Sequence, residues 1–146
     1  MTDKKRHWFW NLVLVITLVV CLSVLVMHYK NWIKVKPQGI QIVSGFYYVD
    51  ISYDELDSVV FVARIPPMER LNGFSALEKE KGIFREFKDS STTKKVHVFV
   101  DNIADRKIKL VYKDSVKLYL NLKDSVRTMD LFHQLEEKIE PEEAPN

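Results

Sequence analysis

The segment "IKLVYKDSVKLYLNL", residues 108–122, shows which kind of fold this chain adopts. Its two halves are short apolar runs rich in β-branched and aromatic residues, and in the second half Leu118 and Leu120 alternate with other side chains. This period of two is typical of half-buried β-strands. Between the halves, Lys113-Asp114 has the polar character of a turn. We therefore expect two short strands joined by a turn.

Similar short apolar or alternating runs occur at five further places between residues 40 and 100. Turn residues such as Ser44-Gly45 and Pro66-Pro67 separate them. Seven short strands with regular turns imply a β-sandwich or a small barrel. The predicted strands are Ile40–Val43, Phe46–Ile51, Ser58–Ala63, Gly82–Phe87, Val96–Val100, Ile108–Tyr112 and Val116–Leu122.

One soluble helix follows the last predicted strand. Asp124 is a suitable N-cap, and a stripe of mainly apolar residues at three- and four-residue spacing begins behind it. We expect this stripe to cover an open side of the sheets. Residues 140–146, "EPEEAPN", are acidic and contain proline, which predicts a disordered tail. The stripe consists of Thr128, Leu131, Phe132, Leu135 and Ile139.

The N-terminal part of the chain predicts a membrane anchor. Residues 8–27 read "WFWNLVLVITLVVCLSVLVM" without a charge, and a helix of about 20 residues spans about 30 Å, the thickness of a bilayer core. The run is longer than a signal-peptide core and no A-x-A-like site follows, which favours an uncleaved anchor. We divide the chain into a basic flank (1–7), a transmembrane helix (8–28), a juxtamembrane linker (29–38), a β-domain (39–139) and the tail.

Charge is unevenly distributed along the chain. Residues 1–36 carry six of the 22 Lys and Arg but one of the 20 Asp and Glu, so residues 37–146 carry sixteen basic and nineteen acidic side chains, a formal charge of −3. This balance argues against nucleic-acid binding. The tight basic cluster at residues 4–6 favours an N-terminus in the cytoplasm and a domain outside it. We expect a single-pass protein of the cell (inner or cytoplasmic) membrane. Cys21, the only cysteine, lies in the predicted anchor and gives no information on compartment.

The segment "RLNGFSALEKEKGIF", residues 70–84, mixes glycines, charges and isolated aromatics. Gly73 and Gly82 would give backbone freedom at two corners. Between and beside them, we expect Phe74, Leu77, Ile83 and Phe84 to return apolar contacts to the core, and residues 78–81 to stay solvated at the tip.

Together with "YLNL" and the later "LFHQL", this segment resembles bacterial pleckstrin-homology-like (PH-like) domains, several of which occur in short membrane proteins. The resemblance covers about residues 39–139. It implies seven strands in two near-orthogonal antiparallel sheets capped by the helix. The first predicted hairpin, "IQIVSGFYYVDI", has no Lys or Arg, so no phosphoinositide site follows from the resemblance. The residues that carry the family motifs, with structural roles, are Arg70, Gly73, Phe74, Gly82, Phe84 and Asn121.

No group of residues predicts catalysis, a cofactor or a metal. "GFSAL", residues 73–77, lacks the second glycine and the strand-to-helix setting of a hydrolase elbow. His97 and His133 lack partners at metal-ligand spacing. "DELD", residues 54–57, lacks the alternating ligands of a calcium loop, and a solvated turn explains it better.

Three functions therefore stay open. The first is a non-catalytic, membrane-tethered interaction module that binds a peptide or a membrane or envelope protein through a sheet edge or rim. The second is a domain that contacts anionic lipid headgroups of its own membrane through Lys94, Lys95, Arg106 and Lys107. The third is an enzyme, which requires a pocket with convergent polar groups that this sequence does not indicate.

Overall fold

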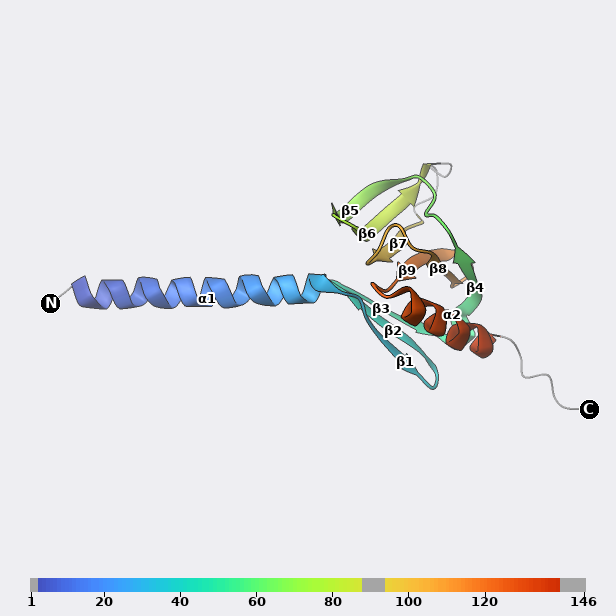
Figure 1. Ribbon diagram of the computed structural model, residues 1–146, viewed down its shortest axis with the longest axis horizontal. Coiled ribbons are helices and arrows are strands. Elements are labelled where there is room, and N and C mark those ends of the chain that lie inside the picture. Colours follow the sequence, from blue (N-terminus) through green and yellow to red (C-terminus); the bar gives the residue numbers. More distant parts are fainter. Residues whose placement is uncertain (1–2, 88–93, 140–146) are drawn as a thin grey trace, which may run out of the picture.

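The computed structural model describes residues 3–87 and 94–139, which form a long helix, two β-sheets and a second helix (Figure 1). Helix α1, Asp3–Tyr29, extends away from the β-domain as an isolated rod. Its stretch Arg6–Tyr29 is strongly apolar, and the most apolar part of this stretch is not buried against the β-domain. Among the described residues, this is the one helix long and apolar enough to cross a membrane.

The first sheet has three antiparallel strands in the order β1-β2-β3: β1 is Trp32–Lys36, β2 is Gly39–Ser44 and β3 is Tyr47–Ser52. A short 3-10 turn, η1 at Tyr53–Glu55, follows. The prediction of a linker over residues 29–38 was wrong, because β1 pairs with β2 along its whole length. The β-domain therefore starts almost at the end of α1, without a flexible spacer.

The second sheet has six strands in the order β4-β8-β9-β7-β6-β5. The chain thus has nine strands in the described residues, not the seven predicted, because β1 and β5 were missed. The expectation of purely antiparallel sheets also fails, because β7 and β9 run parallel. The strands are β4 Leu56–Val62, β5 Met68–Ala76, β6 Lys79–Glu86, β7 Val96–Val100, β8 Lys107–Tyr112 and β9 Val116–Asn121.

The predicted pair of strands around Lys113-Asp114 is confirmed as the β8–β9 hairpin. Lys113 and Asp114 have φ values of 50° and 66°, and positive φ at both central positions belongs to the type I′ turns that match the twist of a hairpin. This hairpin lies between β4 and β7 in the sheet. β8 pairs antiparallel with β4. Because β9 runs parallel to β7, the carboxyl ends of these two strands lie side by side at the same end of the sheet.

The main core lies where the first sheet, the second sheet and helix α2 (Ser125–Ile139) meet. Each fully buried Leu or Ile there contributes about 1.5–3 kcal/mol of hydrophobic stabilisation. The predicted helix is confirmed: the Asp124 side chain accepts from the N–H of Val126 at 2.9 Å, and the predicted stripe faces the core. Core residues from the three layers include Ile40, Ile42, Ile51, Phe99, Ile108, Leu110, Leu118, Leu120, Leu131 and Leu135.

The segment 70–84 forms the β5–β6 hairpin rather than a loop with two corners. Gly73 and Gly82 lie directly opposite each other, and a Cβ added to Gly73 would meet the carbonyl oxygen of Lys81 at 2.1 Å. The turn is at Leu77 and Glu78, where Leu77 is 102% exposed, so it makes no core contact. Lys81, expected in solvent, is fully buried. The expectations for Leu77 and Lys81 were therefore both wrong.

Candidate interaction groove at the base of the anchor helix

Asn31 joins the end of α1 to both sheets. It is 4% exposed, and its backbone N–H donates to Oδ2 of Asp101 at 2.7 Å. Its side-chain amide donates to the carbonyl oxygens of Phe99 at 2.5 Å and Asn121 at 2.9 Å. The hydroxyl of Ser44 donates to its Oδ1 at 2.6 Å. A buried amide with every polar atom satisfied holds neighbouring elements in one arrangement.

Lys81 and Asp101 form a buried ion pair beside Asn31. Their Nζ and Oδ1 atoms are 2.8 Å apart, and the side chains are 0% and 1% exposed. Burial lowers the pKa of Lys81, while the hydrogen bond and charge of Asp101 act in the opposite direction. Lys81 Nζ also donates to the carbonyl oxygen of His28 at 3.3 Å, in the last turn of α1. A cation at the C-terminus of a helix stabilises its free carbonyls and its dipole.

Asn121 organises the loop that carries Asp101. Its Oδ1 accepts from the backbone N–H groups of Asp101 at 2.9 Å and Asn102 at 3.1 Å. Its side-chain N–H groups donate to the carbonyl oxygens of Asn102 at 2.6 Å and Arg106 at 3.2 Å. Four hydrogen bonds from one fully buried amide fix the ends of β7, β8 and β9. We call the buried set Asn31, Ser44, Lys81, Asp101 and Asn121 the joint.

Further contacts surround the last turn of α1. The His28 ring lies 4.8 Å from Phe46 and 5.3 Å from Phe74, measured between ring centroids. Lys79 donates to the Tyr29 carbonyl oxygen, and its Nζ lies 4.5 Å from the centre of the Tyr29 ring. Together with the joint, these contacts tie α1 to both sheets, so the β-domain has a set orientation relative to α1.

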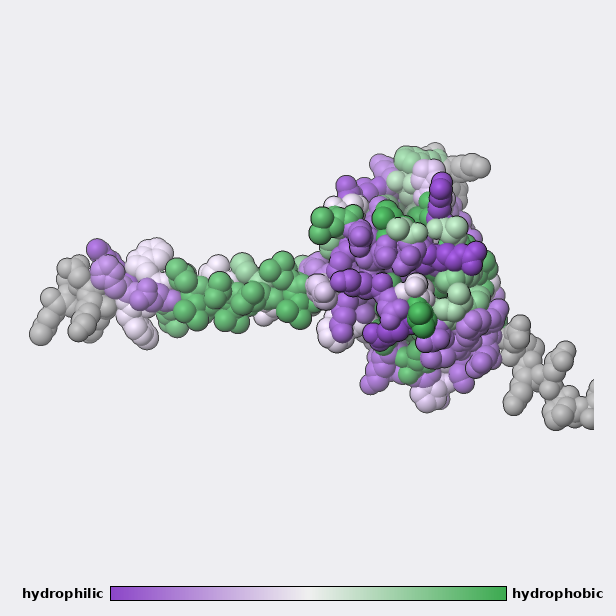
Figure 2. Space-filling view, in the orientation of Figure 1, coloured by the Kyte–Doolittle hydropathy of each residue, from purple (hydrophilic) through white to green (hydrophobic). Residues whose placement is uncertain are grey.

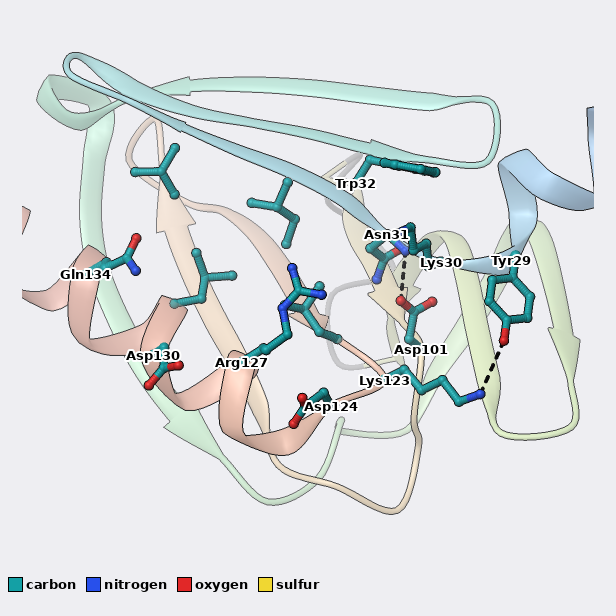
Figure 3. Close-up of a pocket in the computed structure, with 14 residues that line it drawn as sticks. Tyr29, Lys30, Asn31, Trp32, Asp101, Lys123, Asp124, Arg127, Asp130 and Gln134 are labelled. Carbon is teal, nitrogen blue, oxygen red and sulfur yellow. Dashed lines mark hydrogen bonds between the residues drawn. The ribbon is translucent and has the colours of Figure 1, made fainter.

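A groove of about 550 Å³ begins at this point and runs between β1 and the first half of α2 (Figure 3). Its wall on one side is the free edge of β1, which pairs with β2 and with no other strand of the described chain. Asp130 and Gln134 lie along its opposite wall. The lining residues are Tyr29, Lys30, Asn31, Trp32, Ile33, Val35, Asp101, Leu122, Lys123, Asp124, Arg127, Asp130, Leu131 and Gln134.

The groove combines apolar surface with unpaired backbone and mixed charge. Trp32 is 47% exposed and Val35 is 38% exposed, and both lie on β1, the edge strand whose outer side pairs with no other strand of the described chain. Lys123, Asp124, Arg127 and Asp130 bring side chains of both charges to the α2 side of the opening. An exposed strand edge beside side-chain pockets is the arrangement that binds an extended peptide by strand addition.

The structure separates the four residues predicted to contact lipid. Lys107 is 1% exposed, and its Nζ donates to the carbonyl oxygens of Ala63 at 3.4 Å and Ile103, so it cannot serve a surface site. Arg106 is exposed but lies over the Phe61 ring at 5.4 Å.

Lys94 and Lys95 are exposed just before β7, whose first residue pairs with Phe84. That pair is five residues along β6 from Lys79, about 17 Å at strand spacing, so Lys94 and Lys95 lie at the end of the sheet away from α1. The four residues therefore do not form one rim.

The six residues that carry the resemblance to PH-like domains make packing or hydrogen-bond contacts within the fold. Gly73 and Gly82 let β5 and β6 approach closely, and Phe84 is buried in the second apolar cluster with Val96 and Val98. Phe74 contacts His28. Arg70 donates to the hydroxyl of Ser75 at 3.0 Å on the exposed hairpin. Asn121 belongs to the joint.

No reactive centre was found in residues 3–87 and 94–139. No three His, Cys, Asp or Glu side chains in this part could hold a metal ion. Ser75 bonds to Arg70 and Glu80 on an exposed strand, without a histidine. His97 is a partner of the Tyr112 hydroxyl at 3.2 Å, and burial lowers its pKa.

Sequence reasoning missed Asn31, Lys81 and Asp101. Asn31 stood in a predicted linker, Lys81 in a predicted solvated tip and Asp101 in a predicted turn. The one available signal was that a polar residue directly follows the apolar run "VHVFV".

The chain matches no family model, no curated protein and no solved structure.

Proposed function

We propose that this chain is a single-pass protein of the cell membrane whose β-domain is a non-catalytic interaction module. The domain would bind an extended segment of a neighbouring membrane or envelope protein in the groove between β1 and α2. The observation that supports this proposal is the free edge of β1 beside a groove of about 550 Å³. An added strand gains main-chain hydrogen bonds from β1, and side-chain pockets beside it give specificity.

The position of the groove supports a partner in the same membrane. The groove begins at Tyr29 and Lys30, immediately after the membrane helix, and the joint leaves no flexible linker between them. A segment bound there lies next to the bilayer surface, as the juxtamembrane part of another membrane protein does. We place the domain outside the cytoplasm, following the basic cluster at residues 4–6 in the first turn of α1. We retain the PH-like scaffold as a proposal, supported by the two sheets and the closing C-terminal helix.

The test uses a photo-crosslinking amino acid at Val35 in the full chain, in intact membranes, with Val60 as the matched control. Val60 has a similar exposed fraction, 46% against 38%, but lies on β4 outside the groove. The crosslinked partner segment is then made as a peptide and titrated against the full chain in nanodiscs.

We expect adducts from position 35 only, a peptide that protects the β1 amides from hydrogen exchange, and a loss of at least tenfold in affinity for Val35→Arg but not Val60→Arg. Equal crosslinking at both positions, or a peptide that leaves β1 unprotected, would contradict the proposal.

A further inference from the structure

We propose that the β5–β6 turn and the β2–β3 turn form a second membrane contact, in which Leu77 and Phe46 enter the headgroup region of the bilayer that α1 spans. Lys30, Lys79 and Lys123 would face anionic headgroups around them. We call these five residues the membrane-facing rim. This surface shares Lys30 and Lys123 with the groove, but Leu77, Phe46 and Lys79 lie outside it, and the proposed occupant is lipid rather than protein.

Leu77 is the strongest observation. It is 102% exposed and has a φ of 55°, at the first of the two turn residues between the paired Ala76 and Lys79. Gly, Asn or Asp is favoured at such a position, since a positive φ strains other side chains. A leucine there gains no stabilisation from burial, and its positive φ destabilises the fold. The fold therefore gives no reason for this leucine, whereas an apolar environment outside the protein does.

The hairpin that carries Leu77 points toward the membrane side of the domain. Figure 1 shows that the turn between β5 and β6 lies on the side from which α1 leaves the domain, and Figure 2 shows hydrophobic surface at this end of the hairpin. Lys79, two residues after Leu77, donates to the carbonyl oxygen of Tyr29 at the end of α1. Leu77 is thus held near the level at which α1 emerges.

Phe46 supplies a second exposed apolar side chain at the same level. It is 70% exposed in the β2–β3 turn, and its ring packs 4.8 Å from His28 in the last turn of α1. It is therefore continuous with the apolar surface of the membrane helix, whose last residue, Tyr29, is of the aromatic type enriched at membrane interfaces.

Three lysines lie around the point where α1 ends. The Nζ atoms of Lys79 and Lys123 lie 4.5 Å and 5.5 Å from the centre of the Tyr29 ring, and Lys30 lies 4.1 Å from that of Trp32. Glu78, in the β5–β6 turn, is an exposed acidic residue beside them. The ammonium groups of these lysines lie over rings at the end of α1, so positive charge gathers where the chain leaves the helix, and anionic lipid attracts such charge. This charge supports lipid as the occupant.

The test measures depth in the bilayer with the full chain and lipid alone. In a Cys21→Ser background, an environment-sensitive dye is attached to Leu77→Cys or to Phe87→Cys and the protein is reconstituted into vesicles of phosphatidylcholine with phosphatidylglycerol. Phe87 is the matched control because it is also apolar and exposed, at 63%, but lies at the opposite end of the hairpin. We expect a lipid-linked quencher to quench the dye at 77 several-fold more than at 87. Equal quenching at the two positions overturns the proposal, and is the result expected if Leu77 binds a protein partner instead of lipid.

A second variant separates membrane contact from folding. With the dye on Ala76→Cys, Leu77→Gly should reduce quenching to the level of the Phe87 control, while the urea midpoint of unfolding stays equal or rises because glycine accepts the positive φ. Quenching at 76 that is unchanged by Leu77→Gly contradicts the role of Leu77. Quenching that is the same in pure phosphatidylcholine contradicts the role of the lysines.

Discussion

The joint and the tip of the β5–β6 hairpin are only a few residues apart along β6, yet they have opposite chemistry. In the joint, charged and polar side chains are buried, with Lys81 and Asp101 at 0% and 1% exposed. At the tip, an apolar side chain is fully exposed. Each departs from the usual distribution, in which charges face water and leucines are buried. The difference indicates two tasks: the joint fixes the domain on α1, and the tip is directed at a surface outside the protein.

The two regions also depend on each other. Because the joint binds the last turn of α1 through Lys81 and Asn31, the hairpin is held in one orientation relative to α1. Without that constraint an exposed leucine would be a liability for aggregation. In the function that we propose, a rigid joint holds the exposed tip and the groove at a set height above the bilayer.

The largest expected effect comes from breaking the joint with Asp101→Ala. The change leaves Lys81 as a buried charge without its carboxylate and removes the acceptor of the Asn31 N–H. We expect a loss of about 3–5 kcal/mol in the free energy of unfolding. Urea titration of the full chain in detergent, followed by near-ultraviolet circular dichroism, measures it. Asp105→Ala, in the same loop, is the control and should cost at most about 1 kcal/mol. Equal effects of the two changes would show that the joint is not the main constraint.

A smaller loss is expected from Gly73→Ala in the middle of the hairpin. Gly73 has a φ of 127°, and a Cβ would approach the Lys81 carbonyl oxygen to 2.1 Å. Backbone strain and the steric overlap together should cost about 2–3 kcal/mol in the same urea titration. Ser75→Ala, on the exposed part of β5, should change stability by no more than about 0.5 kcal/mol. A Gly73→Ala protein as stable as Ser75→Ala would mean that β5 and β6 can separate without cost.

The joint should also give the domain a pH dependence that the tip lacks. Burial lowers the pKa of Lys81 below its ordinary value of 10.5. Below the lowered pKa both the folded and the unfolded state hold the Lys81 proton, so the contribution of Lys81 to the free energy of unfolding does not change with pH. Above it, only the unfolded state keeps the proton up to 10.5, so stability rises with pH.

Lys81→Met should reduce this rise, and Lys81→Met with Lys107→Met should reduce it further, because burial lowers the pKa of Lys107 as well. The titration must stay below pH 10, the ordinary pKa of tyrosine, because burial raises the pKa of Tyr112 to about 12 and the trend reverses there. Leu77→Gly should leave the rise unchanged. A rise that is the same in wild type and in Lys81→Met would contradict this account.

The smallest expected effect on folding is that of Leu77→Gly. Relief of the strained φ should raise the free energy of unfolding by at most about 1 kcal/mol, since the gain is partly offset by the greater freedom of glycine in the unfolded chain. The measurement is the urea midpoint in detergent, where no bilayer is present. A loss of stability there would show that Leu77 has a packing role within the domain.

Local patterns predicted much of the fold. The strands from Val96 to Asn121 and helix α2 were found because their side chains alternate or form a stripe, which are properties of adjacent residues. The N-terminal helix, long and apolar enough to cross a membrane, was predicted from length and composition alone. β5 was missed because it is exposed on both faces and therefore shows no alternation. β1 was missed because its lysines resembled the basic flank of an anchor.

The sequence by itself determined the element types: an apolar helix as long as a bilayer is thick, a β-rich domain and an amphipathic closing helix. Only the tertiary structure decided the parallel pairing of β7 and β9, the burial of Lys81 against Asp101, and the exposure of Leu77 beside the end of α1. The physical reason is the distance over which each property is defined. Hydrophobic periodicity is a relation between neighbours, whereas an ion pair between residues 81 and 101 and a groove between β1 and α2 exist only after segments far apart in the chain have packed together.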